Sequence, residues 1–172
     1  VDKRKVSGLR DQVNKKQKNK DCKTLSDFRE LIGVKGVDAI LIATPDHWHV
    51  PIAIKAVNAG KDVYVEKPLG VSIEENLALR REVEKTGKIF QYGTQQRSAQ
   101  QFRFAAELVR NGYIGTLESM HAWCPDITSQ EQAFHTPVAG SRAPIDPPPE
   151  LDYNLWLGPA SWTPYTLSLI HI

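Results

Sequence analysis

Three short apolar runs, each followed by polar residues, constrain the fold of this chain more than any other feature. They span residues 37–43, 62–65 and 88–92, and the segments between them have the apolar spacing of helices. This order of strand, helix, strand, helix and strand predicts an α/β fold with a parallel sheet and crossover helices. Because the carboxyl ends of parallel strands lie at one edge of a sheet, we expect the polar residues after the runs to converge there.

Local signals predict where the helices between the runs begin and end. Gly60 and Gly87 are expected to end two of them in the left-handed conformation. Ser72 and Glu75 have the spacing of a capping box, which marks the start of the second helix. The inward face of that helix is predicted from three apolar residues, Ile73, Leu77 and Val83.

Segments outside the three runs add further elements. A short helix is predicted over residues 26–32, with Ser26 or Thr24 as its N-cap. Residues 102–109 have helical spacing. The alternation over residues 115–123 predicts a strand that begins a new structural unit.

Positive charge is concentrated at the start of the chain. Residues 1–23 hold nine Lys or Arg residues and three Asp residues, a composition that is also typical of nucleic-acid contacts. The segment has no aromatic residue for base stacking, which favours a solvated helix face. No apolar run approaches the ~20 residues of a membrane span. We therefore expect neither a nucleic-acid partner nor a membrane partner.

The length and the two ends lead us to expect a piece of a longer protein. A chain of 172 residues suits one domain, or one domain and part of another. Its only methionine is Met120, so we do not expect it to open at a translation start. Residues 167–172 are interpreted as a non-native tail and are left out of the fold prediction.

Lys67 is the foremost candidate for chemistry. It follows the second apolar run and stands between Glu66 and Pro68. A lysine in a partly desolvated cleft has its charged form disfavoured, which suits proton transfer, whereas the Glu66 carboxylate favours the ammonium form. A surface lysine that follows a strand is the alternative.

The loop after the first run carries a second group of candidates. Asp46 follows Pro45 and is expected to begin a helix whose N-terminal amides suit an anionic ligand such as a pyrophosphate. His47 and His49 have no third ligand at a fitting spacing, so we expect no metal, and capping or cofactor contact is favoured. Trp48 has two interpretations, either a core residue or a lid against a flat ring.

A third group, Gln95, Gln96 and Arg97, follows the last apolar run. Amide and guanidinium groups suit hydroxyl-rich or phosphate ligands, and capping of the next helix is the alternative. Neither of the glycine-rich phosphate motifs, GxGxxG and GxxxxGK, occurs in the chain.

Five stretches together resemble one known family. They are residues 37–49, the AGKDVYVEKP run at 59–68, the GTQQRS run at 93–98, residues 112–115, and the WLGPA run at 156–160. Their sequence and order are similar to those of the glucose-fructose oxidoreductase, inositol dehydrogenase and rhizopine catabolism (Gfo/Idh/MocA) family. The AGK…EKP run that follows a TPD loop is the most specific part of the resemblance.

The resemblance implies two domains. Residues 1–97 would be the C-terminal portion of a Rossmann domain, a doubly wound parallel sheet that binds NAD or NADP. Residues 98–166 would begin an α/β or α+β open-sheet domain for the substrate and for homo-oligomer contacts. The implied reaction is hydride transfer between nicotinamide and a carbinol carbon of a sugar, sugar derivative or cyclitol.

The same resemblance implies roles for particular residues. Lys67 corresponds to the lysine near the nicotinamide and the substrate hydroxyl, so it is the expected catalytic residue. The expected cofactor contacts are Thr44, Pro45, Asp46, His49, Glu66, Lys67 and Gln95. Lys67, Arg97 and Trp156 are expected to bind the substrate.

Two departures and two alternatives accompany this prediction. The family's upstream glycine-rich turn and its downstream Asp-x-x-x-His element are absent from these 172 residues, so we expect the chain alone to be inactive. An NAD-dependent glycosidase is one alternative, because the loop of such relatives resembles Trp48-His49, but retention of Lys67 favours the oxidoreductase. A non-catalytic NAD-binding protein is the other. The expected compartment is the cytoplasm, with the periplasm as the alternative.

Overall fold

The computed structural model describes residues 3–123 and 143–166, and these fall into two units. The first unit holds the described residues up to Gly93 together with those from Ala143 onward. The second begins at Thr94.

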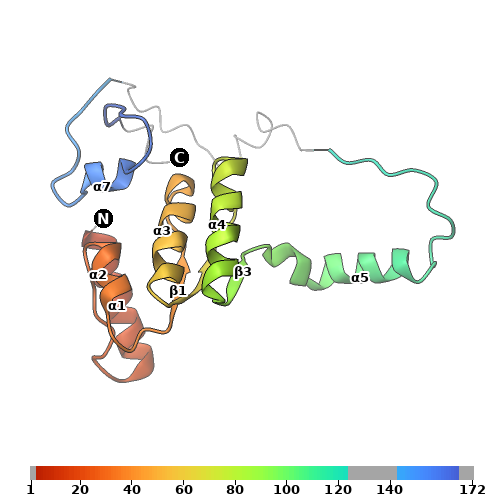
Figure 1. The fold of residues 1–172 in the computed structure, drawn as a ribbon, viewed down its shortest axis with the longest axis horizontal. Helices are drawn as coiled ribbons and strands as arrows, with labels where there is room; N and C mark the ends of the chain where they lie inside the picture. The colour runs from red at the N-terminus through yellow and green to blue at the C-terminus, as the bar shows by residue number, and fades with distance from the viewer. Residues whose placement is uncertain (1–2, 124–142, 167–172) are drawn as a thin grey trace. The chain divides into compact units, whose positions relative to one another are not determined.

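The first unit contains a three-stranded parallel sheet in the order β1-β2-β3, which confirms the α/β prediction (Figure 1). Its strands are β1 (Ala39–Ile42), β2 (Asp62–Val65) and β3 (Phe90–Tyr92). In register, Ile42 of β1 pairs with Val65 of β2, which in turn pairs with Tyr92 of β3. The three carboxyl ends therefore lie at one edge.

Two helices, α3 (Asp46–Asn58) and α4 (Ile73–Thr86), lie side by side and pack on one face of this sheet (Figure 1). Alternate strand residues point toward them, because successive side chains of a strand face opposite sides. The buried core comprises Ile40, Ile42, Val50, Ile52, Ala53, Ala56, Val57, Val63, Val65 and Leu79. On the opposite face of the sheet, Leu41 is 67% exposed.

The inward face of α4 differs from the prediction. Ile73 is 73% exposed and Leu77 is also exposed, whereas Leu79 is buried and Val83 packs against the core. Positions 79 and 83 are one helical turn apart and lie on the same face of the helix. The face of α4 that meets α3 is therefore rotated from the face that the apolar residues predict.

The caps of α4 follow the prediction more closely. Ser72 Oγ accepts the Glu75 amide at 3.2 Å, but the Glu75 carboxylate accepts the amide of Val71 rather than that of Ser72. Gly87 has φ +65° and Gly60, after α3, has φ +80°, as expected for left-handed helix ends.

The N-cap of helix α2 (Phe28–Gly33) is Asp27, so the prediction of Ser26 or Thr24 as its N-cap is wrong. The Asp27 backbone is extended, and its carboxylate accepts the Arg29 amide at 2.8 Å. The Arg29 guanidinium also pairs with this carboxylate. A cap must stand directly before the first helical residue, which Ser26 does not.

We expect Asp27→Ala to cost about 1 kcal/mol of unfolding free energy at neutral pH, because it removes this cap. Hydrogen bonds from the Arg29 side chain and then its amide hold the pKa of Asp27 below its usual value. A depressed folded-state pKa means that the stabilisation exists above the unfolded pKa of about 3.9 and is lost as the pH falls through the folded value. Thermal unfolding across this range checks the prediction, with Ser26→Ala as the control; equal losses in the two variants would contradict it.

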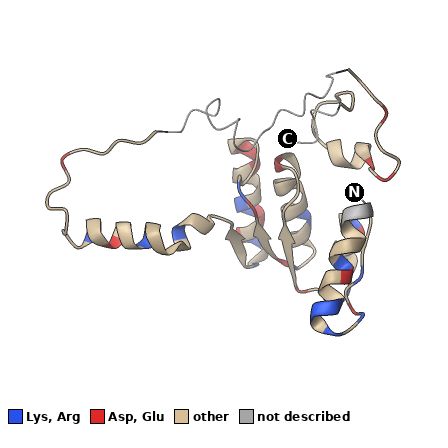
Figure 2. Cartoon of the chain, turned by 180° about the vertical axis from the view of Figure 1, so that it is seen from behind, with Lys and Arg blue, Asp and Glu red and all other residues tan. Residues whose placement is uncertain are grey.

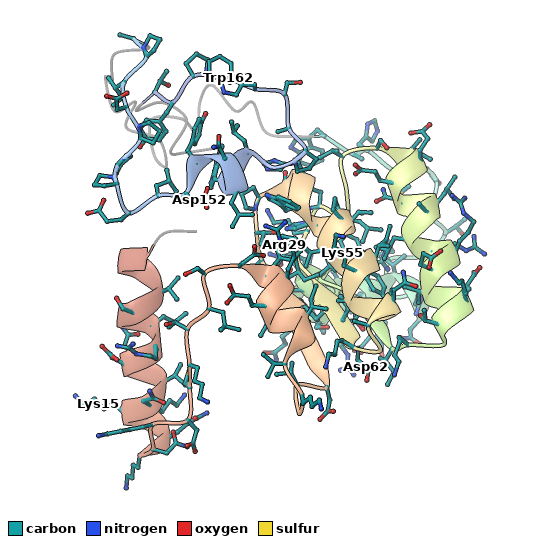
Figure 3. All side chains as sticks on the ribbon, turned by 60° about the vertical axis from the view of Figure 1, so that its left-hand side comes forward. Lys15, Arg29, Lys55, Asp62, Asp152 and Trp162 are labelled. Atoms are coloured by element: carbon teal, nitrogen blue, oxygen red, sulfur yellow. The ribbon has the colours of Figure 1, made fainter. Side chains whose placement is uncertain are left out.

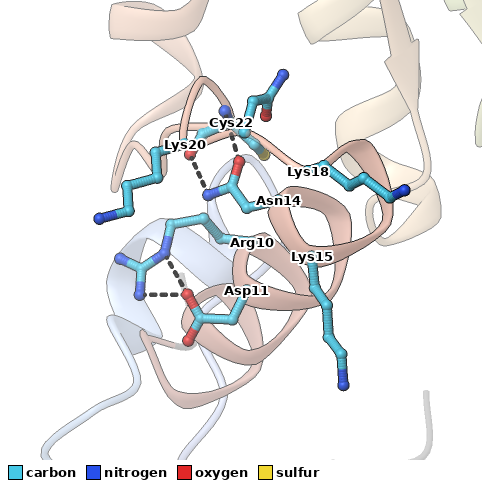
Figure 4. A pocket seen from close by; sticks show the side chains of 8 residues that line it. Arg10, Asp11, Asn14, Lys15, Lys18, Lys20 and Cys22 are labelled. Atoms are coloured by element: carbon cyan, nitrogen blue, oxygen red, sulfur yellow. Dashed lines mark hydrogen bonds and ion pairs between the residues drawn. The ribbon is translucent and has the colours of Figure 1, made fainter.

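Helix α1 (Lys3–Gln17) confirms a helix over most of the basic segment, and residues 18–23 form the loop after it. Figure 2 shows Lys and Arg positions along α1. The Asn14 side chain closes the following loop by accepting the Cys22 amide at 2.9 Å and donating to the Cys22 carbonyl at 3.2 Å (Figure 4). Arg10 pairs with Asp11 beside it. The surface around this loop is a shallow basic pocket that includes Lys15 and Lys18.

The second unit contains a 3₁₀ turn, η1 (Gln95–Ser98), and helix α5 (Gln100–Arg110). The predicted strand over 115–123 is wrong: the structure assigns it no strand, and Met120 is 84% exposed. A strand needs a partner to bind its backbone groups, and no described strand pairs with this segment. Within the described ranges, no helix has the length and apolar character to cross a membrane.

Candidate functional site

The loops that follow β1 and β2 leave the sheet at the same edge. The Glu66 amide donates to the Ile42 carbonyl at 2.9 Å, which extends the ladder between the two strands to the start of the second loop. Thr44 and Asp46 follow β1, and Lys67 follows β2. The fold thus places two groups of candidate residues, about 20 residues apart in sequence, on neighbouring loops.

The side chains of these loops are accessible to a ligand. Thr44, Asp46 and Lys67 are exposed, while Pro45 and Glu66 are half-buried. The Lys67 amide donates to the Glu66 carboxylate at 3.3 Å. The described residues do not enclose Lys67 in the partly desolvated cleft considered from the sequence. Across those same residues, no group of three or more His, Cys, Asp or Glu could hold a metal ion.

Helix α3 presents its N-terminus at this edge. Pro45 is its N-cap and supplies no side-chain hydrogen bond, and Asp46 is the acidic residue of the first turn. In the described part of the chain, the amides of Asp46 and His47 donate to no other group. These amides and the positive end of the helix dipole are therefore available for an electron-rich ligand group.

His49 lies beneath these loops. Its side chain is 1% exposed. Its Nδ1 is 2.6 Å from the Pro68 carbonyl oxygen, and its Nε2 is 2.9 Å from the Thr44 carbonyl oxygen. Both ring nitrogens thus face the main chain of the two loops. The predicted cofactor contact of His49 stays a prediction.

His47 and Trp48 contact a segment more than 100 residues further on, helix α7 (Tyr153–Leu157). His47 Nε2 lies 2.9 Å from the Trp156 carbonyl oxygen, and Trp48 Nε1 donates to the Leu155 carbonyl at 2.9 Å. Trp48 also packs edge-on against Phe28 of α2, with 5.1 Å between ring centroids. This docking could not be predicted from the sequence, because nothing local to either segment indicates the other.

The start and the end of α7 are also held against this region. Asp152 caps α7 by accepting the Leu155 amide, and it lies near Arg29 of α2 (Figure 3). The Asp27 carboxylate chiefly, and Asp152 to a lesser extent, hold the pKa of Arg29 above its usual value. Gly158 ends α7 with φ +48°, and a Cβ there would overlap the Trp48 indole.

The remaining candidates divide between the units. Trp156 belongs to the first unit, where its ring meets that of His47 edge-on at 6.0 Å. Gln95 and Arg97 lie in η1 of the second unit, and both are exposed. Gly93, just before them, was not singled out from the sequence. A Cβ there would come within 2.9 Å of Val65 O and Tyr64 Oη, so this end of β3 requires glycine.

A parallel sheet with a helix N-terminus and accessible polar side chains at the carboxyl ends of its strands is typical of α/β proteins that bind nucleotides at this edge. The chain belongs to the Gfo/Idh/MocA oxidoreductase family. Residues 2–94 match the family model, which is described as an oxidoreductase family with an NAD-binding Rossmann fold. This match confirms the predicted family, the Rossmann-type sheet and the nicotinamide cofactor.

Individual proteins agree with this assignment. The chain is 38% identical over 89 residues to scyllo-inositol 2-dehydrogenase (NAD(+)) of Bacillus subtilis (strain 168), covering 52% of this chain and 26% of that protein. It is 32% identical over 90 residues to glycosyl hydrolase family 109 protein 1 of Shewanella sp. (strain ANA-3), covering 52% of this chain and 20% of that protein.

Among solved structures, myo-inositol 2-dehydrogenase from Lactobacillus plantarum superposes with a TM-score of 0.57 at 29% identity, covering 64% of this chain and 32% of that one. The chain thus spans between a fifth and a third of the length of these three proteins.

Proposed function

We propose that the protein carrying this chain is an NAD(P)-dependent oxidoreductase that moves a hydride between nicotinamide and a carbinol carbon of a cyclitol, sugar or sugar derivative. The observation that carries the proposal is the exposed Lys67 beside Glu66, on the loop next to Thr44–Asp46, in a chain of an NAD-binding oxidoreductase family. The cyclitol class is supported by the similarity to inositol dehydrogenases.

The donor and acceptor groups at the sheet edge fit a dinucleotide. The Thr44 hydroxyl and the carboxylates of Asp46 and Glu66 can bind ribose hydroxyls or a carboxamide, and the free amides of α3 can bind an electron-rich atom. The bound nicotinamide would accept or supply the hydride. Lys67 would bind the substrate hydroxyl and exchange its proton. Gln95 is proposed as a further cofactor contact.

Substrate recognition is proposed for Arg97 and Trp156. A guanidinium group and an aromatic ring suit the hydroxyls and the flat face of a sugar or cyclitol ring. We also propose that the whole protein is a homo-oligomer, as the family resemblance implies.

An NAD-dependent glycosidase is the second candidate function, and one observation favours it. The chain is similar to a glycosyl hydrolase over 90 residues, a length close to the 89 residues over which it matches the dehydrogenase. The two candidates differ in their products, since a glycosidase leaves no net reduced cofactor.

The test incubates the full-length protein with NAD⁺ or NADP⁺ and a panel of inositols, aldoses and aryl glycosides. We expect reduced nicotinamide, detected by its fluorescence, with at least one cyclitol or sugar. NAD-dependent release of the aryl group without reduced cofactor would replace the oxidoreductase with the glycosidase. Cofactor binding with no turnover of any substrate would favour a non-catalytic NAD-binding protein.

A further inference from the structure

His49 joins two loops that the sheet by itself leaves separate. One nitrogen of its ring faces the Thr44 carbonyl, in the loop after β1, and the other faces the Pro68 carbonyl, in the loop after β2. The first loop carries Thr44 and Asp46, and the second carries Lys67. A single rigid ring therefore spans the backbones that bear the proposed cofactor-binding and catalytic groups.

Burial gives this link its importance. Only 1% of the surface of His49 is exposed. Its neighbours along α3, Trp48 and Val50, belong to the core or pack against it. A buried polar side chain that loses its partners is costly, so the loops are held at the distance that the ring sets. Which ring nitrogen donates to the carbonyl that it faces depends on the tautomer of the ring.

We propose that His49 is a positioning residue, which sets the distance between the loop 44–46 and the loop 66–68 and so aligns Lys67 with the cofactor-binding groups. The proposal rests on the proposed oxidoreductase function for its catalytic consequence, but the link itself does not depend on it. Direct contact of the ring with a cofactor is disfavoured, because neither ring nitrogen is turned outward.

Two conservative variants separate the two bonds. The amide nitrogen of Asn reaches about as far as the Nδ1 of His, and that of Gln about as far as Nε2. His49→Asn should thus keep the bond to Pro68, and His49→Gln the bond to Thr44. His49→Ala keeps neither. Val57→Ala is the matched control, since Val57 is equally buried on the same helix but about 12 Å along its axis from His49.

Hydrogen exchange measured residue by residue on this chain tests the link without any need for activity. We expect His49→Ala to speed exchange roughly tenfold at the hydrogen-bonded amides of the two segments, that of Trp48 in residues 44–48 and those of Lys67 and Val71 in residues 67–71. His49→Asn should restore protection to the second segment only, and His49→Gln to the first only. Val57→Ala should leave both segments unchanged. Unaltered exchange in both segments of His49→Ala would overturn the proposal.

Kinetics of the full-length protein test the catalytic consequence. We expect His49→Ala to lower kcat by roughly 10²-fold, since small displacements of reacting groups have effects of this size, while Val57→Ala stays within about twofold. A loss confined to NAD⁺ affinity would overturn the positioning role in favour of direct cofactor contact. If the hydrogen-exchange pattern is as expected but the full-length protein turns over no substrate, the proposed function is wrong and the role of His49 in joining the two loops stands.

Discussion

Lys67→Ala should lower kcat/KM of the full-length protein by roughly 10²- to 10⁴-fold, the range for loss of a proton-transferring side chain. The Lys67 side chain is exposed at the carboxyl end of β2, and its ammonium has no hydrogen-bond or ion-pair partner among the described residues. It is therefore available to a substrate hydroxyl. Initial rates of nicotinamide reduction, with the substrate identified from the panel, measure the effect.

The matched control for this variant is Lys55→Ala. Lys55 is an exposed lysine on α3 of the same unit, away from the carboxyl ends of the strands. We expect its rates to match the wild type. The affinity of both variants for the cofactor should be measured by fluorescence titration. A Lys67→Ala rate within tenfold of the wild type would exclude proton transfer by this residue.

The second large effect is expected from Gly158→Ala, which should release α7 from α3. The added Cβ would overlap the rigid Trp48 indole, and a positive φ at a non-glycine residue costs about 1–3 kcal/mol in addition. The bonds from His47 and Trp48 to α7 are then expected to break. Faster hydrogen exchange at the amides of Trp156 and Gly158, which bond within α7, measures the release.

The control is a glycine that also has a positive φ but has no atoms close to the position of an added Cβ. Gly36 has φ +82° and no atom within 4 Å of the position of an added Cβ, so Gly36→Ala carries the backbone cost alone and should leave α7 protected. Combining Gly158→Ala with Trp48→Phe should recover part of the protection, because the smaller ring makes room and the bond from His47 to α7 is kept, although the bond from Trp48 is lost. Equal behaviour of the two glycine variants would exclude the steric explanation.

The sheet and the helix ends could be predicted because their causes are local. The apolar runs specified β1, β2 and β3, and Gly60 and Gly87 marked helix ends through the conformation that they permit. The convergence of polar loops followed from the parallel order of the strands. These inferences need only the neighbours of each residue and the rules of chain connection.

What could not be predicted depends on contacts between distant residues. The docking of His47 and Trp48 onto α7 joins positions more than 100 residues apart. The inward face of α4 depended on how that helix lies against α3, which turned Leu79 inward and Ile73 outward. The environment of Lys67 likewise depends on which segments surround its loop.

The attachment of α7 also has a consequence for protein engineering. Both hydrogen bonds from α3 end on main-chain carbonyl oxygens, those of Leu155 and Trp156. An acceptor of this kind is present whatever side chain the residue carries, whereas His47 and Trp48 supply the donors from their side chains. The exposed position of α7, Asn154, could therefore be changed to alter the surface beside the loop after β1, while the Asp152 cap, buried Leu157 and Gly158 are kept and the anchor is not rebuilt.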